Sequence, residues 1–253
     1  MIEVRNLHKT FGEKHVLRGV NLAIRNGESI TIIGQSGCGK SVLLKHLVGL
    51  LEPEAGEVVV DGERITGARR KELYEIRKKF GVLFQGSALF DSMTVENNVG
   101  LALRTHTTMT AEQVSERVAE CLRLVSMEGT QKLKPAELSG GMKKRVGLAR
   151  AIAMQPAYIL YDEPTTGLDP ITADSINDLV IHLNHALKVT TVVVTHDMVS
   201  AYKVSDRIVM LHEGEIIFSG TPQETQTTDM NIVRRFVTGE ADEHPYVITR
   251  YER

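Results

Sequence analysis

An eight-residue segment, Gly34 to Ser41, constrains this chain more than any other feature of its sequence. It reads Gly-Gln-Ser-Gly-Cys-Gly-Lys-Ser and fits the pattern G-x-x-x-x-G-K-[ST] without a mismatch. Glycines let the backbone curl so that successive N–H groups point at phosphate oxygens, and a helix N-terminus adds partial positive charge. The β-branched run at 29–33 precedes the segment and apolar positions at helical spacing follow it. The sequence therefore predicts a strand, a phosphate-binding loop and a helix in direct succession.

Each position of the loop has a chemical task. Lys40 is placed to put a cation on the β- and γ-phosphates, and Ser41 offers a hydroxyl to Mg²⁺. The alternative is a glycine-rich turn that only joins a strand to a helix, and the buried-looking strand and amphipathic helix argue against it. The predicted nucleotide-binding residues of the loop are Gly34, Gln35, Ser36, Gly37, Cys38, Gly39, Lys40 and Ser41. Cys38 is interpreted as a small loop filler rather than a reactive thiol.

Two carboxylates follow a second apolar strand. Residues 158–161 are apolar or aromatic, and Asp162 and Glu163 come directly after them. Asp162 at the strand end is expected to face the phosphate loop and to hold the hydration shell of Mg²⁺. Glu163 points elsewhere and suits a general base beside the γ-phosphate. A surface Asp-Glu pair is the plainer reading of this dipeptide, and the intact phosphate loop outweighs it.

A further strand, residues 192–195, delivers His196. A single histidine at a strand end is more often structural than functional. Since this strand is expected beside the Glu163 strand, His196 is also placed to contact the γ-phosphate or the attacking water. The spacing alone leaves both readings open.

Strand-like and helix-like patterns alternate at both ends of the chain, and residues from about 88 to 154 have a helical texture. Thr110 and Gln113 form a capping box, and Asp169 with Pro170 opens another helix. This order predicts an α/β core with a mostly parallel sheet and a helical lobe inserted in the middle. The basic run at 68–79 is interpreted as a solvated helix face. Residues 241–253 are expected to form a loosely organised C-terminal tail.

Composition excludes several classes of protein. Lys plus Arg number 30 and Asp plus Glu 32, giving a net charge of −2, so nothing favours binding to nucleic acid or to an anionic membrane. Two cysteines are too few for a disulfide framework or a structural zinc site. No apolar run approaches the roughly 18 residues that span a bilayer, and no secretory signal begins the chain. We expect a cytosolic chain that cannot cross a membrane by itself.

A second glycine-rich helix start needs its own explanation. Leu138-Ser139-Gly140-Gly141-Met142 places Ser139 as a helix cap, with exposed amides suited to an anion. One chain already has a complete phosphate cradle. A head-to-tail dimer supplies the reason, because each nucleotide would lie between the phosphate loop of one copy and the Ser139 segment of the other.

With this element the sequence resembles the ATP-binding cassette superfamily, the ATPase subunits of ABC transporters, over roughly residues 1–238. The resemblance implies a P-loop core, an N-terminal antiparallel β subdomain and an ABC domain spanning residues 1–240. It implies Mg²⁺-dependent ATP hydrolysis by a homodimer that holds two ATP. Carried over to this chain, it assigns the Walker A loop at 34–41, the Q-loop glutamine Gln85 on Mg²⁺, the signature residues Ser139, Gly140 and Gly141, the Walker B Asp162, the catalytic Glu163, the D-loop Asp169, the switch His196 and the adenine-stacking Phe11.

The signature departs from the usual pattern at one place, where Met142 replaces Gln. The residues that form the anion nest are intact, so activity is not expected to be lost. Met142, the segment after Gln85 and the late 235–239 segment together resemble Mla/Mce-type lipid transport ATPases. That resemblance implies an integral-membrane permease, an Mce-domain protein and in some cases a STAS-domain protein as partners. It also implies attachment to the cytoplasmic side of the inner membrane through the permease.

The segment after Gln85 is expected to contact that permease. Ala88, Leu89, Phe90 and Met93 are interpreted as a socket for a permease helix, and the alternative is core packing of the helical lobe. The alternative functions are import of a small solute such as an amino acid, a soluble ABC-type ATPase acting on ribosomes or DNA, and a nucleotide kinase. A kinase does not explain the Ser139 segment. The cargo and its direction are open, since cargo does not touch this subunit.

Overall fold

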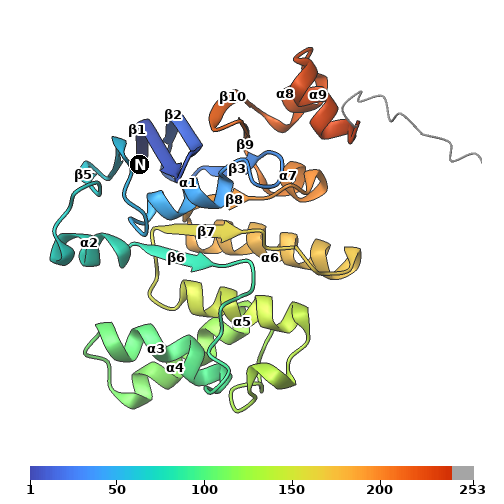
Figure 1. The fold of residues 1–253 in the computed structure, drawn as a ribbon. Helices are drawn as coiled ribbons and strands as arrows, with labels where there is room; N and C mark the ends of the chain where they lie inside the picture. Colours follow the sequence, from blue (N-terminus) through green and yellow to red (C-terminus); the bar gives the residue numbers. More distant parts are fainter. Residues whose placement is uncertain (241–253) are drawn as a thin grey trace, which may run out of the picture.

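The fold is taken from a computed structural model that describes residues 1–240. The predicted tail at 241–253 lies outside the described residues. Two sheets share the chain, a smaller antiparallel one near the N-terminus and a larger, mostly parallel one (Figure 1). This arrangement confirms the predicted α/β class with an N-terminal antiparallel part.

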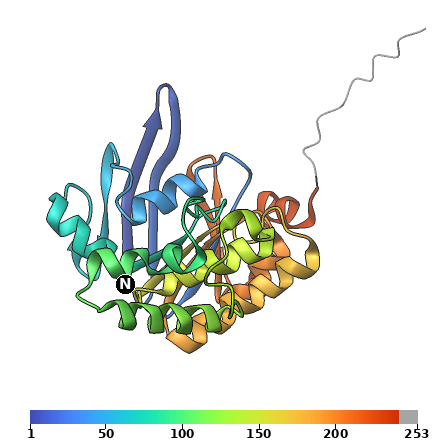
Figure 2. The ribbon, with the colours of Figure 1, turned by 90° about the horizontal axis from the view of Figure 1, so that it is seen from below.

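The N-terminal sheet has the strand order β2-β1-β4-β5. Its strands are β1 (Ile2–Phe11), β2 (Lys14–Ile24), β4 (Ala55–Val60) and β5 (Glu63–Arg64). All of its pairings are antiparallel. The β1–β2 hairpin extends away from most of the helices (Figure 2). Asp61 and Gly62 form the turn between β4 and β5.

The core sheet has the strand order β10-β9-β3-β8-β7-β6. Its strands are β3 (Ser29–Ile33), β6 (Phe80–Leu83), β7 (Tyr158–Asp162), β8 (Thr190–Val194), β9 (Arg207–His212) and β10 (Glu215–Gly220). Every pairing is parallel except that of β9 with β10. The central strands β3, β7 and β8 are buried along their whole length, as expected for parallel strands covered on both faces.

The side chains of β7 alternate between two hydrophobic clusters, one on each face of the sheet. Tyr158 and Leu160 pack with helix α1 (Lys40–Leu47) and the N-terminal sheet. Ile159 and Tyr161 face the opposite way and pack with the helices on the other side of the sheet. Successive side chains of a strand point to opposite faces, so one strand supplies both cores.

The helical segments on that second side correspond to the predicted helical stretch. They are α3 (Val95–His106), α4 (Ala111–Leu124), the short 3₁₀ helix at Pro135–Glu137 and α5 (Gly140–Ile152). They lie together on the side of β6 and β7 away from β1 and β2 (Figure 1). The capping box of Thr110 and Gln113 opens α4 as predicted. The remaining helices are α2 (Arg70–Arg77), α6 (Pro170–Leu187), α7 (Met198–Val204), α8 (Pro222–Thr227) and α9 (Asn231–Thr238).

The parallel register brings three strand ends to one place. Asp162 at the end of β7 is paired with Val194 of β8, and Ile32 of β3 is paired with the same Val194. The phosphate loop, the two carboxylates and His196 each follow one of these strands. In parallel sheets ligands bind at the carboxyl ends of the strands, so this edge is where a site is expected. Among residues 1–240, no helix combines the length and the apolar character that crossing a membrane requires.

Candidate nucleotide site

The phosphate loop depends on glycine at two positions where the backbone has a positive φ. Gly34 has φ +150°, and a Cβ there would lie 2.2 Å from the carbonyl oxygen of Leu211. Gly39 has φ +111°, and a Cβ there would lie 2.9 Å from the carbonyl oxygen of Val16. A side chain at either position would therefore force the loop away from the neighbouring strands. The loop is fixed by close backbone approach at both ends.

Lys40 begins helix α1 and its ammonium turns back over the loop. Its Nζ donates to the carbonyl oxygens of Gly34 at 2.8 Å and Gln35 at 3.0 Å. The side chain is 6% exposed, and no acidic residue occupies the first turn of α1. A cation, a free helix N-terminus and loop amides thus converge on one point, which is the arrangement that binds phosphate.

Ser41 and Asp162 are in contact across the site. The Oγ of Ser41 donates to Oδ1 of Asp162 at 2.8 Å. These residues come from different strand ends, and the parallel register brings them together. A hydroxyl and a carboxylate at this spacing match what Mg²⁺ takes from protein when substrate phosphates supply the rest of its shell. The residues present therefore fit the predicted metal position.

Glu163 is buried and its carboxylate accepts three hydrogen bonds or ion-pair contacts. Oε1 lies 3.0 Å from Nδ1 of His196, and Oε2 accepts from the hydroxyls of Thr166 at 3.1 Å and Thr195 at 3.2 Å. The side chain of His196 is 60% exposed. The structure thus brings His196 against Glu163, as its predicted position required. The carboxylate is held in one orientation at the edge of the cavity.

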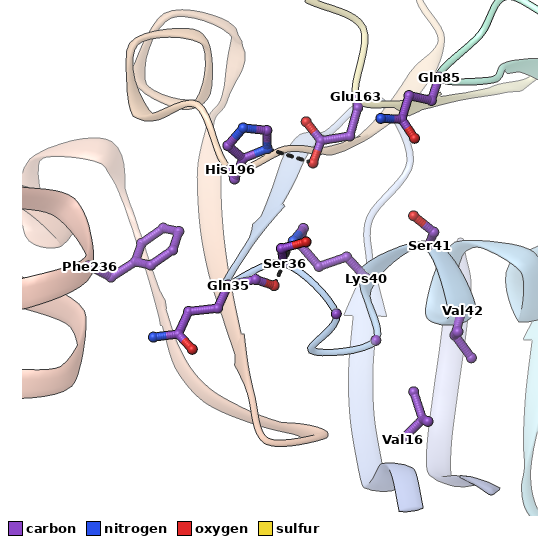
Figure 3. Close-up of a pocket in the computed structure, with 12 residues that line it drawn as sticks. Val16, Gln35, Ser36, Lys40, Ser41, Val42, Gln85, Glu163, His196 and Phe236 are labelled. Atoms are coloured by element: carbon purple, nitrogen blue, oxygen red, sulfur yellow. Dashed lines mark hydrogen bonds and ion pairs between the residues drawn. The ribbon is translucent and has the colours of Figure 1, made fainter. Parts of the chain in front are cut away.

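Lys40, Ser41, Glu163 and His196 line a cavity of about 640 Å³, and Asp162 does not line it. Figure 3 shows Lys40 and Ser41 below Glu163, His196 and Gln85, with open space between them. Gln85 follows β6 and reaches the cavity from the side opposite His196 (Figure 3). The predicted residues that line it are Gln35, Ser36, Gly37, Gly39, Lys40, Ser41, Gln85, Glu163 and His196. The volume lies within the range of pockets that hold a nucleotide-sized ligand.

Three lining residues were not predicted, namely Val16, Val42 and Phe236. Val16 belongs to β2 and Val42 to α1, and each looks like an ordinary apolar position in the sequence. Phe236 comes from α9 and faces the cavity next to Gln35 and His196 (Figure 3). No local signal marks it, since its proximity depends on how α9 packs against the core.

Phe11 does not line this cavity. It ends β1 at the hairpin, its ring is 48% exposed, and Nζ of Lys9 lies 5.3 Å from the ring centroid. Its role in stacking on adenine stays a prediction.

Cys38 is half-buried in the loop. Burial raises the pKa of its thiol, although Lys40 opposes that effect. A raised pKa disfavours the reactive thiolate, which supports the interpretation of Cys38 as loop filler.

The signature residues lie apart from the cavity. Ser139 caps α5 by accepting from the backbone N–H of Met142 at 3.3 Å, and both Ser139 and Gly140 are exposed. Asp169 caps α6 by accepting from the N–H of Thr172 at 3.0 Å, and this bond lowers the pKa of Asp169. A Cβ on Gly141 would lie 2.7 Å from Cγ2 of Thr172, so the two helix starts are neighbours. The exposed amides of α5 face no phosphate loop within residues 1–240.

Comparison with protein families gives one match to this chain over residues 17–166, the family described as ABC transporter. These residues include the phosphate loop, Gln85, the Ser139 segment and both carboxylates. The match covers more than half of the chain.

Similar proteins extend the likeness to nearly the whole chain. The probable ribonucleotide transport ATP-binding protein mkl of Mycobacterium leprae is 43% identical over 94% of this chain and 69% of its own length. The chloroplastic protein TRIGALACTOSYLDIACYLGLYCEROL 3 of Arabidopsis thaliana is 41% identical over 96% of this chain and 74% of its length. The intermembrane phospholipid transport system ATP-binding protein MlaF of Haemophilus influenzae is 40% identical over 96% and 92%.

Solved structures agree with the fold. The dimeric bacterial ABC transporter cassette MJ0796 superposes with a TM-score of 0.82 at 38% identity, covering 88% of this chain and 99% of that one. A dimeric post-hydrolysis state of the same cassette, bound to ADP and Pi, has a TM-score of 0.81 at 37% identity, covering 88% of this chain and 99% of that one. The cbiO1 protein of Clostridium perfringens gives 0.81 at 28% identity over 95% and 98%.

Proposed function

This chain belongs to the ABC transporter family, as an ATPase coupled to transport, and on that premise we propose that it powers lipid transport between membranes in an Mla/Mce-type complex. The ATPase function is supported best by one observation: Lys40, Ser41 and Glu163 line one cavity, and Asp162 accepts a hydrogen bond from Ser41. The lipid cargo is supported by the names of two relatives. One is an intermembrane phospholipid transport ATPase and the other is named for a galactolipid.

The first step is nucleotide binding by the phosphate loop. The loop amides and the N-terminus of α1 hold the phosphates, and the Lys40 ammonium exchanges its bonds to Gly34 and Gln35 for β- and γ-phosphate oxygens. Phe11 offers an aromatic face for the adenine, as the family resemblance implies. The phosphate charge is thus neutralised before chemistry begins.

Ser41, Asp162 and Gln85 are the residues that would hold Mg²⁺. Ser41 and Asp162 are already 2.8 Å apart, and Gln85 lines the same cavity. When bound, the ion neutralises negative charge on the β- and γ-phosphates.

Hydrolysis requires a base beside the γ-phosphate, and we assign Glu163. Its carboxylate takes a proton from water as the water oxygen bonds to the γ-phosphorus and the bond to the ADP oxygen breaks. Thr166, Thr195 and His196 hold the carboxylate in place.

His196 also reaches the cavity, where it can orient the water or contact the γ-phosphate. For His196→Ala we expect turnover to fall at least about tenfold with nucleotide affinity preserved. Near-native turnover in this variant would assign His196 a structural role.

The exposed Ser139 segment implies a homodimer that holds two ATP. Two solved structures of one relative, the cassette MJ0796, are dimeric, which supports this assembly. In the proposed dimer, Ser139, Gly140 and Gly141 of one copy and Asp169 beside them face the phosphate loop of the other. The closed dimer forms on ATP and opens after hydrolysis.

The segment after Gln85 is the proposed contact with the permease. Phe90 is 50% exposed there, as a docking surface requires. Through this contact the subunit would lie on the cytoplasmic side of the inner membrane. Its further partners would be Mce-domain and STAS-domain proteins, and it would not bind nucleic acid. We propose that residues 1–240 form the ABC domain and that 88–154 acts as its helical lobe.

The cargo is tested by reconstituting the subunit with its permease in vesicles that contain fluorescent phospholipid. We expect lipid movement that depends on ATP and disappears with Glu163→Gln. The mycobacterial relatives are named for ribonucleotide transport, so labelled ribonucleotides are assayed in parallel. ATP-driven accumulation of ribonucleotide or amino acid without lipid movement would replace the lipid proposal and leave the ATPase intact.

A further inference from the structure

A buried lysine of helix α5 joins two loops that border the cavity. Lys144 is 4% exposed, and its Nζ donates to the carbonyl oxygen of Gln85 at 2.6 Å and to that of Glu163 at 3.1 Å. The helix that carries it begins at the Ser139 segment. One ammonium group therefore connects the Q-loop, the proposed base and the helix that faces a partner copy.

Both loops have strained backbones where α5 holds them. Glu163 has φ +51°, and Ser87 and Ala88 have φ +60° and +47°. Residues other than glycine adopt this left-handed region only when surrounding contacts compensate. The bond from Lys144 to the Glu163 carbonyl is one such contact.

Arg150, two turns further along α5, holds the same segment. It donates to the carbonyl oxygens of Ala88 and Ser87, both at 2.6 Å. Between the two cations, Gly147 lets the helix approach β6, because a Cβ there would lie 2.6 Å from Cδ1 of Leu83. Helix α5 lies against β6 in Figure 1, and its Lys144 and Arg150 side chains bond the backbone of the segment that follows β6.

The segment continues from these anchors to Phe90. The fully buried Asn98 accepts from the N–H of Phe90 at 2.8 Å and donates to its carbonyl oxygen at 3.1 Å. Hydrogen bonds from the side chains of Lys144 and Asn98 to the backbone thus fix the segment from Gln85 to Phe90 at both ends. A displacement of Phe90 is therefore transmitted to α5 and to the carbonyl that Lys144 binds.

We propose that Lys144 is a positioning residue that ties Glu163 to the Gln85–Phe90 segment, so that the geometry of the base depends on what occupies that segment. The proposal rests on the proposed function, because it takes Glu163 as the base and Phe90 as the docking point. Lys144 acts on the backbone of Glu163 and does not touch the reacting atoms. A protein bound at Phe90 then changes the rate of hydrolysis without contacting the nucleotide.

The charge of Lys144 has a reason in this position. Burial lowers the pKa of the ammonium, and the carboxylates of Glu163 and Asp162 oppose that effect. A buried cation persists where hydrogen bonds and opposite charges compensate its lost hydration. The alternative is a lysine that only stabilises the fold, and the experiment separates the two roles.

The test compares Lys144→Met, Lys144→Arg and the control Lys143→Met in the purified subunit. Lys143 is the neighbouring residue on α5, and within residues 1–240 its side chain makes no hydrogen bond or ion pair. For Lys144→Met we expect kcat to fall about 10- to 100-fold with KM for ATP within about twofold, because the base is misplaced while the phosphate loop is intact. Lys144→Arg keeps donors and charge and should recover part of kcat, and Lys143→Met should match the parent chain.

Coupling is measured as the ratio of kcat with the permease to kcat without it. We expect this ratio to approach one in Lys144→Met and to be restored toward the parent value in Lys144→Arg. A Lys144→Met protein that melts like the parent and keeps both its kcat and its ratio overturns the proposal. The proposal is also overturned if kcat and nucleotide affinity fall together and in proportion to a fall in the melting temperature. That result would identify a purely structural role for Lys144.

The double variant Glu163→Gln with Lys144→Met separates two possible errors: a wrong role for Lys144 and a wrong assignment of Glu163 as the base. Glu163→Gln should form an ATP-trapped dimer, and Lys144→Met added to it should still form that dimer, because Lys144 is not needed for binding or closure. If the double variant does not dimerise while Glu163→Gln does, the positioning role of Lys144 is wrong. If Glu163→Gln turns over ATP at the parent rate, the base assignment fails, whatever Lys144 does.

Discussion

The cavity around Lys40 and the start of helix α5 are both glycine-rich helix N-termini, yet only the first is complete within one chain. Around Lys40 the cation, Ser41 and the buried Glu163 surround a cavity, and Asp162 is bonded to Ser41. At the other helix start, Ser139 and Gly140 are exposed, and only the cap bond to Met142 occupies the serine side chain. The difference indicates that one region holds nucleotide by itself and the other needs a second copy.

The largest effect is expected from Glu163→Gln. Losing the base should lower turnover by about 10²- to 10⁴-fold while ATP binding remains, because Lys40 and the loop are unchanged. The measurement is phosphate release beside nucleotide binding, with the exposed Glu128→Gln as control. Turnover near the parent rate would remove Glu163 from the base role.

Lys40→Ala should impair nucleotide binding, the step before hydrolysis. Removing charge-assisted bonds to phosphate is expected to weaken ATP binding by about 10- to 100-fold. The control is Lys45→Ala, an exposed lysine of the same helix. Fluorescent nucleotide titration measures both, and equal affinities would show that the loop amides alone bind the phosphates.

The comparison is tested most directly by mixing two inactive variants. In a dimer of Lys40→Ala with Ser139→Arg, one site carries both defects and the other carries neither, so activity should return to a sizeable fraction of the parent. The heterodimer of the double variant with the parent chain has one defect in each site and should stay low. Each heterodimer is isolated with a different affinity tag on each chain, so that parent–parent dimers do not contribute. If the two heterodimers behave alike, the two regions do not share a nucleotide, and the Ser139 segment has another role.

The smallest effect on hydrolysis is expected from Phe90→Asp. The change lies outside the cavity, so ATP binding by the isolated subunit should be unchanged, while co-purification with the permease weakens. Leu50→Asp is a matched control, since Leu50 and Phe90 are each 50% exposed. Unchanged co-purification in Phe90→Asp would assign this side chain to packing of the helical segment instead.

Much of the Lys40 region was predictable because its residues are neighbours along the chain. The phosphate loop follows β3 and precedes α1, and Asp162 ends β7, as the local patterns indicated. Helix caps at Thr110 and Asp169 were also local, since a cap and the backbone N–H that donates to it are three residues apart. Short-range hydrogen bonding leaves a readable pattern in sequence.

Other features left no such pattern. The approach of Phe236 to the cavity depends on how α9 packs, more than 190 residues after the phosphate loop. Lys144 lies in a basic run that looks solvated, but its side chain is buried between two loops. Phe11 fits the family motif, but the hairpin leaves its ring exposed and outside the cavity.

The sequence by itself determined the chemistry of this protein, because the phosphate loop, the strand-end carboxylates and the Ser139 cap are each specified by residues close in the chain. The tertiary structure alone decided which groups meet. The parallel register of β3, β7 and β8 brings Ser41 to Asp162 and Glu163 to His196. It also decided that Lys144 binds Gln85 and Glu163 together, since such contacts arise from packing between distant segments and not from local conformational preference.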